Sequence, residues 1–180
     1  MTATLRPLRT VTVVLAAWLA LANLATAALF YVDLDVASSG AGGANDPFRT
    51  VGEAVTALNA AARGTHTLYI ASGTYRSTLN GGLEDFTTGG TTDGLLFTNP
   101  GGGNFQTINL RGGYAGWQGG SSYDWGEALR VPRSSVFDLS LSNTRAFDTS
   151  TDARQIQSYD GFVFREGDAG GDGGAIRNRG

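Results

Sequence analysis

The chain contains no cysteine and no lysine, and it has one histidine and one methionine. Without cysteine, disulfide bonds cannot stabilise the fold, and thiol catalysis and cysteine-ligated metal sites are excluded. Because His66 is the single histidine, no metal or proton-transfer site of one chain can use two histidines. The sequence also lacks a Gly-x-Ser-x-Gly nucleophile motif, and its glycine clusters lack the lysine of a phosphate-binding loop.

The basic residues of the chain are all arginine, thirteen in number, and they form no patch interleaved with aromatic residues. Such a patch is the usual feature of a surface that binds nucleic acid. We therefore expect no nucleic-acid partner.

The first 27 residues have the composition of a secretory signal peptide. Arg6 and Arg9 precede an apolar run over residues 11–24, and Ala25-Thr26-Ala27 follows as a small-x-small cleavage site. A membrane anchor is the alternative, because an apolar segment of about 20 residues can span a bilayer. Cleavage after Ala27 removes two positive charges and changes the formal charge from −3 to −5. We expect a bacterial protein that is secreted or exposed at the cell surface, with no membrane insertion after cleavage.

Glycine is abundant in the remainder, with 27 residues, all of them after position 39. A glycine content far above the usual ~7% indicates either disorder or very frequent turns. Short apolar runs recur between the glycines at intervals of roughly 20 to 35 residues, within the range of repeat proteins. They favour turns, and predict strands at residues 29–33, 67–71, 74–75, 95–97, 105–114, 136–141, 156–164 and 175–176.

One helix is predicted between the first two strands. Apolar residues recur at helical spacing from Val51 to Ala62, and Thr50 with Glu53 has the spacing of a capping box. Gly64 provides a stop signal after the helix. The apolar side of this helix predicts that it packs on an apolar surface.

The order of these elements resembles the N-terminal part of the right-handed parallel β-helix of pectate-lyase-like exported proteins. The residues that carry this resemblance are a Tyr-Val-Asp strand at 31–33, Asn-Asp-Pro-Phe at 45–48, Gly-Thr-Tyr at 73–75, Asp-Gly-Phe at 160–162 and Gly-Gly-Ala-Ile at 173–176. The last motif is also similar to the repeat of chlamydial polymorphic membrane proteins, although their companion Phe-x-x-Asn motif does not stand beside it.

The resemblance implies an all-β solenoid, a right-handed parallel β-helix with an N-terminal α-helical cap, truncated at its C-terminal end. Residues 28–64 would supply the first strand and the capping helix, because an open solenoid end needs a cover. Residues 65–180 would form the first coils, with a glycine-rich excursion at about 76–105. Further coils or a partner would have to cap the C-terminal edge.

Acidic residues are densest at Glu166, Asp168 and Asp172. Carboxylates on a glycine-rich turn can bind Ca²⁺, which takes six to eight oxygen ligands, and they can equally be solvated surface acids. The resemblance to pectate lyases implies Ca²⁺ together with an arginine base, for which Arg145, Arg154 and Arg165 lie near the predicted strands. Pairing of these arginines with neighbouring acids is the alternative role.

Four aromatic residues are concentrated in a glycine-rich loop: Tyr114, Trp117, Tyr123 and Trp125. Aromatic faces on a loop can hold sugar rings, and the alternative is that these rings pack on the fold. We expect any ligand site to lie in this loop. The sequence thus favours an exported adhesin or glycan-binding protein that binds a polysaccharide or a cell-surface glycan. We expect no catalysis in this segment and no cofactor other than Ca²⁺. A calcium-dependent polysaccharide lyase or glycoside hydrolase and a structural spacer are the alternatives.

Overall fold

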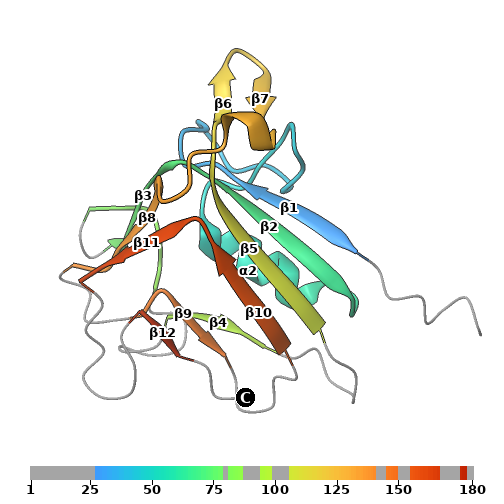
Figure 1. Cartoon of the computed structure of the whole chain (residues 1–180), viewed down its shortest axis with the longest axis vertical. Coiled ribbons are helices and arrows are strands. Elements are labelled where there is room, and N and C mark those ends of the chain that lie inside the picture. Colours follow the sequence, from blue (N-terminus) through green and yellow to red (C-terminus); the bar gives the residue numbers. More distant parts are fainter. Residues whose placement is uncertain are drawn as a thin grey trace, which may run out of the picture.

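The computed structural model describes residues 27–78, 81–86, 94–98, 106–140, 145–149, 155–166 and 175–177. Strands predominate in this part of the chain, with one α-helix among them (Figure 1). The elements are β1 (Ala28–Val32), α2 (Val51–Ala60), β2 (Thr65–Ala71), β3 (Gly73–Arg76), β4 (Leu95–Phe97), β5 (Gln106–Tyr114), β6 (Gly116–Gly119), β7 (Ser122–Asp124), the 3₁₀ helix η2 (Glu127–Leu129), β8 (Ser135–Asp138), β9 (Phe147–Thr149), β10 (Gln155–Asp160), β11 (Phe162–Arg165) and β12 (Ile176–Arg177).

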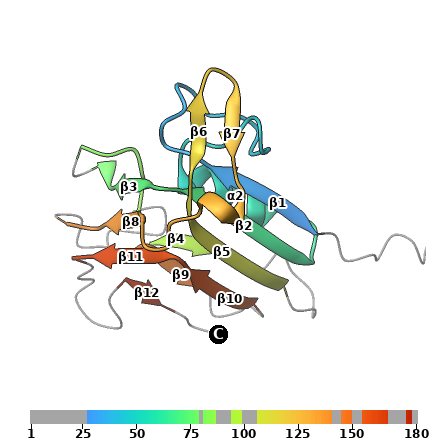
Figure 2. The same ribbon diagram turned by 45° about the horizontal axis from the view of Figure 1, so that its top comes forward.

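The described strands form four sheets. The largest has the order β1-β2-β5-β10 and all its pairs are parallel. Two smaller parallel sheets have the orders β11-β8-β3 and β12-β9-β4. The fourth is the antiparallel hairpin β6-β7, which stands clear of the rest at the top of the molecule (Figures 1 and 2).

Helix α2 begins as the sequence predicts. Thr50 is the N-cap, its hydroxyl accepts a hydrogen bond from the Glu53 amide, and the Glu53 carboxylate accepts one from the Thr50 amide, which confirms the capping box. The helix ends earlier than predicted, at Ala60, because Ala61 takes an extended conformation and donates its amide to the Leu58 carbonyl. The predicted stop signal, Gly64, is therefore not what ends the helix.

A second carboxylate, that of Glu84, caps the same N-terminal end of α2. Glu84 is buried, and its two oxygens accept hydrogen bonds from the amides of Val51 (2.7 Å) and Gly52 (3.1 Å). The first amides of a helix have no partner within the helix, and the helix dipole favours negative charge there. The segment that carries Glu84 is thus fixed to α2.

The apolar core lies between α2 and the three parallel sheets. Val51, Ala54, Val55 and Leu58 form the buried side of α2 and pack in the same cluster as the inward residues of β2, β4, β5 and β8. Phe137 of β8 is at its centre. The core thus joins all three parallel sheets to the helix.

The prediction of one right-handed parallel β-helix with a helical cap is wrong. The described strands are distributed over several small sheets, one of them antiparallel, and α2 contributes its buried side to the common core instead of covering the end of a solenoid. The positions of the predicted strands agree closely with those observed, because alternation and turn residues are local signals. The division of strands among sheets depends on contacts distant in the sequence.

Among the described residues, no helix is long and apolar enough to cross a membrane.

Candidate ligand-binding site

The β6-β7 hairpin presents two of the aromatic residues singled out in the sequence. Trp117 and Tyr123 are paired across the two strands, so that both side chains lie on one side of the hairpin. The Trp117 side chain is 41% exposed, and its indole nitrogen donates to the Gly120 carbonyl (3.0 Å). The hairpin thus exposes an indole whose orientation is fixed by its own turn.

Asp33 holds the base of this hairpin. Its carboxylate is 1% exposed and accepts hydrogen bonds from the amides of Trp117 and Asp35. Burial raises the pKa of Asp33, although both amides favour the ionised form. The hairpin is therefore attached to the residue that directly follows β1, 84 positions earlier in the chain.

Gly116 is required at this attachment. Its φ of 66° lies in the left-handed region, and a Cβ atom there would lie 2.3 Å from Asp33 Oδ2 and 2.7 Å from the Ala71 Cβ. Gly116→Ala should therefore destabilise the protein by more than the roughly 1–2 kcal/mol that left-handed backbone costs a residue with a side chain. Urea denaturation measures the loss.

Gly120→Ala is the matched control. Gly120 has nearly the same φ, 63°, but a Cβ atom at this position meets nothing within 4 Å. This variant should incur the backbone cost alone. Equal losses for the two variants would contradict the role of the Asp33 contact.

Beneath the hairpin, four aromatic rings form a cluster on the outer side of the large sheet. Tyr31 of β1 stacks on Tyr69 of β2 at 5.1 Å, and Tyr69 meets Tyr114 edge-on at 5.1 Å. Trp125 closes the cluster against Tyr31 at 4.9 Å and donates its indole N–H to the Ala44 carbonyl (2.8 Å). Aromatic pairs at such distances stabilise one another, so the four rings join β1, β2 and β5 to the segment that follows the hairpin.

Charged residues continue the cluster along the sheet. Glu127 accepts a hydrogen bond from the Tyr114 hydroxyl (2.6 Å) and forms an ion pair with Arg111, whose guanidinium nitrogen lies 2.7 Å from the carboxylate. Arg130 pairs with Asp160 (2.9 Å) and its guanidinium lies 5.4 Å from the centre of the Tyr114 ring. Burial and the bond to Glu127 raise the pKa of Tyr114, so this hydroxyl remains a donor at neutral pH.

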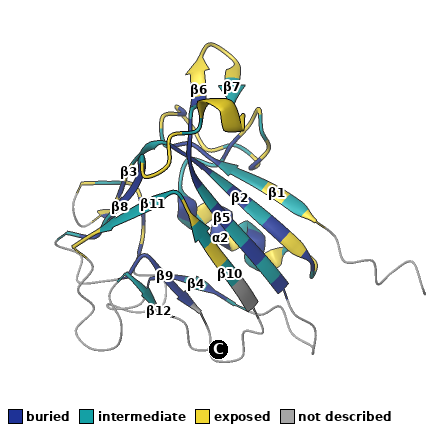
Figure 3. Cartoon of the chain, in the orientation of Figure 1, coloured by how far each residue is buried: buried dark blue, intermediate teal, exposed yellow. Residues whose placement is uncertain are grey.

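The outer side of the large sheet carries polar side chains on β2, β5 and β10, and the exposed Leu29 of β1 begins the same register row. Strand register places Thr67, Asn109 and Ser158 side by side on β2, β5 and β10, and Ser158 donates to Asn109 (2.8 Å). The next row along consists of Tyr31, Tyr69, Arg111 and Asp160. Figure 3 shows buried and more exposed residues alternating along β2, with α2 behind the sheet and the exposed hairpin beyond its upper end. Neighbouring strands lie about 4.8 Å apart, so the hydrogen-bonding side chains on β2, β5 and β10 repeat at that interval.

The structure thus divides the predicted aromatic site in two. Tyr114 has 0% exposure and Trp125 is half-buried, so both pack on the fold, whereas Trp117 and Tyr123 are on the hairpin. Sequence reasoning missed Tyr31 and Tyr69, which complete the cluster. Their outward positions follow from the alternation of their strands, but their proximity to Trp125 does not.

The residues predicted to bind calcium are only partly covered by the structure. Glu166 is exposed with a left-handed φ of 55°, and Asp168 and Asp172 lie outside the described residues. Within the described ranges no group of three or more His, Asp or Glu side chains could hold a metal ion. Calcium binding by these three residues stays a prediction.

The three arginines considered as the base of a lyase differ in their exposure to solvent. Arg145 is 2% exposed, Arg165 is exposed, and Arg154 lies outside the described residues. A buried guanidinium cannot reach a polysaccharide at the surface. His66 is buried in β2, where its Nδ1 accepts a hydrogen bond from the Ala28 amide (3.2 Å), and burial lowers its pKa.

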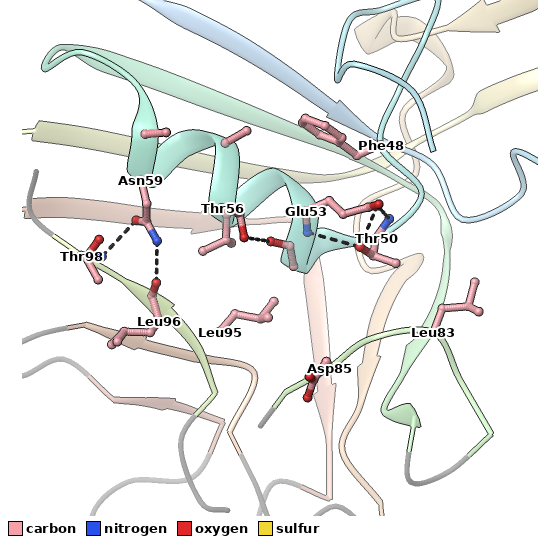
Figure 4. A pocket seen from close by; sticks show the side chains of 14 residues that line it. Phe48, Thr50, Glu53, Thr56, Asn59, Leu83, Asp85, Leu95, Leu96 and Thr98 are labelled. Atoms are coloured by element: carbon pink, nitrogen blue, oxygen red, sulfur yellow. Dashed lines mark hydrogen bonds between the residues drawn. The ribbon is translucent and has the colours of Figure 1, made fainter. Parts of the chain in front are cut away.

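A cavity of about 750 Å³ lies between α2 and β4 (Figure 4). Polar groups along it are engaged in the fold: Asn59 bonds to Leu96 and Thr98, and Thr56 bonds to the Gly52 carbonyl. Ligand pockets usually combine apolar walls with a few convergent polar groups. Since these polar groups serve α2 and β4, the aromatic hairpin is the stronger candidate.

No protein-family model, curated protein or solved structure matches the chain.

Proposed function

We propose that the protein is exported through residues 1–27 and binds a polysaccharide or a cell-surface glycan, without catalysis by the described residues. The observation that carries this proposal is the exposed indole of Trp117, paired with Tyr123 on a hairpin whose base is held by the buried Asp33. An indole face can contact the C–H face of a sugar ring, and a preorganised site avoids the entropy cost of ordering it on binding.

The outer side of the large sheet supports the same function. A sugar chain offers hydroxyl groups along its length, and the row of Thr67, Asn109 and Ser158 offers hydroxyl and amide groups at a regular interval. Arg111 and Asp160 in the adjacent row are partly exposed and can add charged hydrogen bonds. In this proposal the hairpin fixes one sugar ring, and the sheet contacts its neighbours.

Trp117→Ala should weaken glycan binding about tenfold, the equivalent of ~1.4 kcal/mol, because the variant removes the exposed ring. A glycan array identifies the ligand, and titration calorimetry with that ligand measures the change. The thermal midpoint should stay close to that of the wild type, since the indole lies at the surface.

Leu129→Ala is the matched control, because Leu129 is also a large exposed apolar residue, with 56% exposure, but lies outside the hairpin. It should leave binding unchanged. Unchanged binding in Trp117→Ala, or an array without any bound glycan, would contradict the proposed function.

A further inference from the structure

His66 lies on the apolar side of β2. It occupies the first buried position of the strand, ahead of Leu68 and Ile70, and is 0% exposed. A buried polar side chain costs free energy unless it is hydrogen-bonded. The Nδ1 atom of His66 has such a partner in the Ala28 amide, at 3.2 Å.

Two independent observations meet at Ala28. The sequence predicts cleavage after Ala27, so that Ala28 would be the first residue of the exported chain. In the structure β1 begins at the same residue, and Ala28 and His66 form the first pair of its register with β2. The nitrogen of the predicted new N-terminus and the donor to His66 are therefore the same atom.

The protonation state of His66 suits an amine donor. Because Nδ1 accepts a hydrogen bond, this nitrogen carries no proton, and the proton of the neutral ring is on Nε2. Burial lowers the pKa of His66, an effect that the Ala62 backbone reduces. An α-amino group ordinarily has a pKa of about 7.7–8.0, above that of histidine at about 6.5. At neutral pH the amine is thus charged and the imidazole is neutral.

We propose that the imidazole of His66 binds the N-terminus that cleavage after Ala27 releases. This inference rests on the export proposed above. Hydrolysis of the Ala27–Ala28 peptide bond adds the hydroxyl of water to the Ala27 carbonyl carbon and its hydrogen to the Ala28 nitrogen, which takes a further proton from solvent. An ammonium then replaces the neutral amide as donor to Nδ1, and charge-assisted hydrogen bonds are the stronger ones.

The surroundings of Ala28 accommodate this charge. Ala28 is half-buried and Ala27 is exposed. One N–H of the ammonium can therefore donate to the buried Nδ1 atom while the others reach water, so the charge keeps part of its hydration. His66 needs no rearrangement, since its acceptor already faces this nitrogen.

The contact fixes the start of a strand that leads to the candidate site. β1 continues from Ala28 to Tyr31 of the aromatic cluster, and Asp33, which holds the hairpin, follows the strand directly. Cleavage thus strengthens the attachment of the strand on which the glycan site depends.

The mass of the protein exported from a bacterial host tests the position of the new N-terminus. We expect the full chain to lose residues 1–27 and to begin at Ala28. A protein that keeps these residues would contradict the proposed export as well. A mature chain that begins at another residue would overturn the contact with His66 alone.

Acetylation of the mature protein with an amine-selective reagent tests the ammonium. The chain contains no lysine, so the α-amino group of Ala28 is the single aliphatic amine of the mature chain. The acetyl group takes the place of the Ala27 carbonyl and Cα atoms and leaves one neutral N–H for His66. Acetylation should lower the thermal midpoint by about 2–4 °C, because a neutral donor replaces a charged one.

Variants test whether His66 is the acceptor. In His66→Leu, which has no acceptor at this position, acetylation should leave the thermal midpoint unchanged. Ile108→Val is the matched control, because Ile108 lies beside His66 in the register and is equally buried. This variant loses stability but keeps the imidazole, so the effect of acetylation should persist.

Nuclear magnetic resonance supplies a readout that needs no variant. The chain has one histidine, so the signals of its ring protons are unambiguous, and acetylation should shift them. The proposal is overturned if acetylation changes neither these signals nor the thermal midpoint, or if the midpoint falls equally in His66→Leu.

Discussion

Phe137→Ala should lower the free energy of unfolding by about 3–5 kcal/mol, the range for truncating a buried aromatic residue. Phe137 has 0% exposure, and its ring lies 5.5 Å from that of Tyr75, 5.1 Å from that of Phe147 and 5.4 Å from that of Phe164. These neighbours belong to β3, β9 and β11, so the cavity left by the ring would open between two sheets. Urea denaturation followed by near-ultraviolet circular dichroism measures the loss.

Leu129→Ala serves as the control for this experiment, because an exposed position should change stability by no more than about 0.5 kcal/mol. Both variants truncate an apolar side chain, but that of Phe137 is buried and that of Leu129 is exposed. If Phe137→Ala stayed within about 1 kcal/mol of the wild type, Phe137 could not be at the centre of the core.

Stability should also depend on pH through Glu84. Burial raises the pKa of this carboxyl from 4.5 to about 7, an effect that the Val51 and Gly52 amides reduce and the nearby Glu53 increases. The folded state therefore holds the proton more tightly than the unfolded state does. The contribution of Glu84 is fully present below pH 4.5 and is lost as pH rises to about 7, a loss of up to about 3 kcal/mol.

Glu84→Gln isolates this contribution, since the amide cannot titrate. His66, whose pKa is lowered by burial, acts in the opposite direction and reduces stability as pH falls below 6.5. Both proteins contain His66, so its effect cancels in the difference between their free energies of unfolding. That difference should change by up to about 3 kcal/mol between pH 4.5 and 8 in favour of the variant. Parallel curves would contradict a raised pKa.

Local features of the fold could be predicted from the sequence. The capping box of Thr50 and Glu53 and the buried stripe of α2 depend on residues within a few turns of one another. Strands β2, β4 and β5 likewise follow from apolar residues with turn residues at their ends. Such patterns predict which side of a helix or strand is buried.

The partners of each element could not be predicted in this way. Glu84 caps α2 from 33 positions further along the chain, and nothing local distinguishes it from a surface acid. The sequence predicts a loop where the hairpin β6-β7 lies, because its strands are short and glycine is frequent in and around them. Where a strand enters a sheet depends on such distant contacts, which explains why the predicted solenoid was wrong.

The candidate site was predictable in its composition but not in its geometry. A cluster of rings between Tyr114 and Trp125 indicated a functional loop, yet the sequence did not separate the packed rings from Trp117. That distinction depends on Asp33, which lies immediately after β1 and has no sequence feature that indicates its contact with the hairpin. The glycan itself is identified by the array experiment.

The contact between Asp33 and Trp117 has a consequence for the order in which the molecule folds. It closes a loop of 84 residues that contains β2, β3, β4 and β5. Contacts of such long range slow folding, because the chain loses entropy before they contribute. The indole of Trp117 should therefore reach its final position late, and in a chain whose other tryptophans are replaced its fluorescence would report the completion of folding rather than the initial collapse.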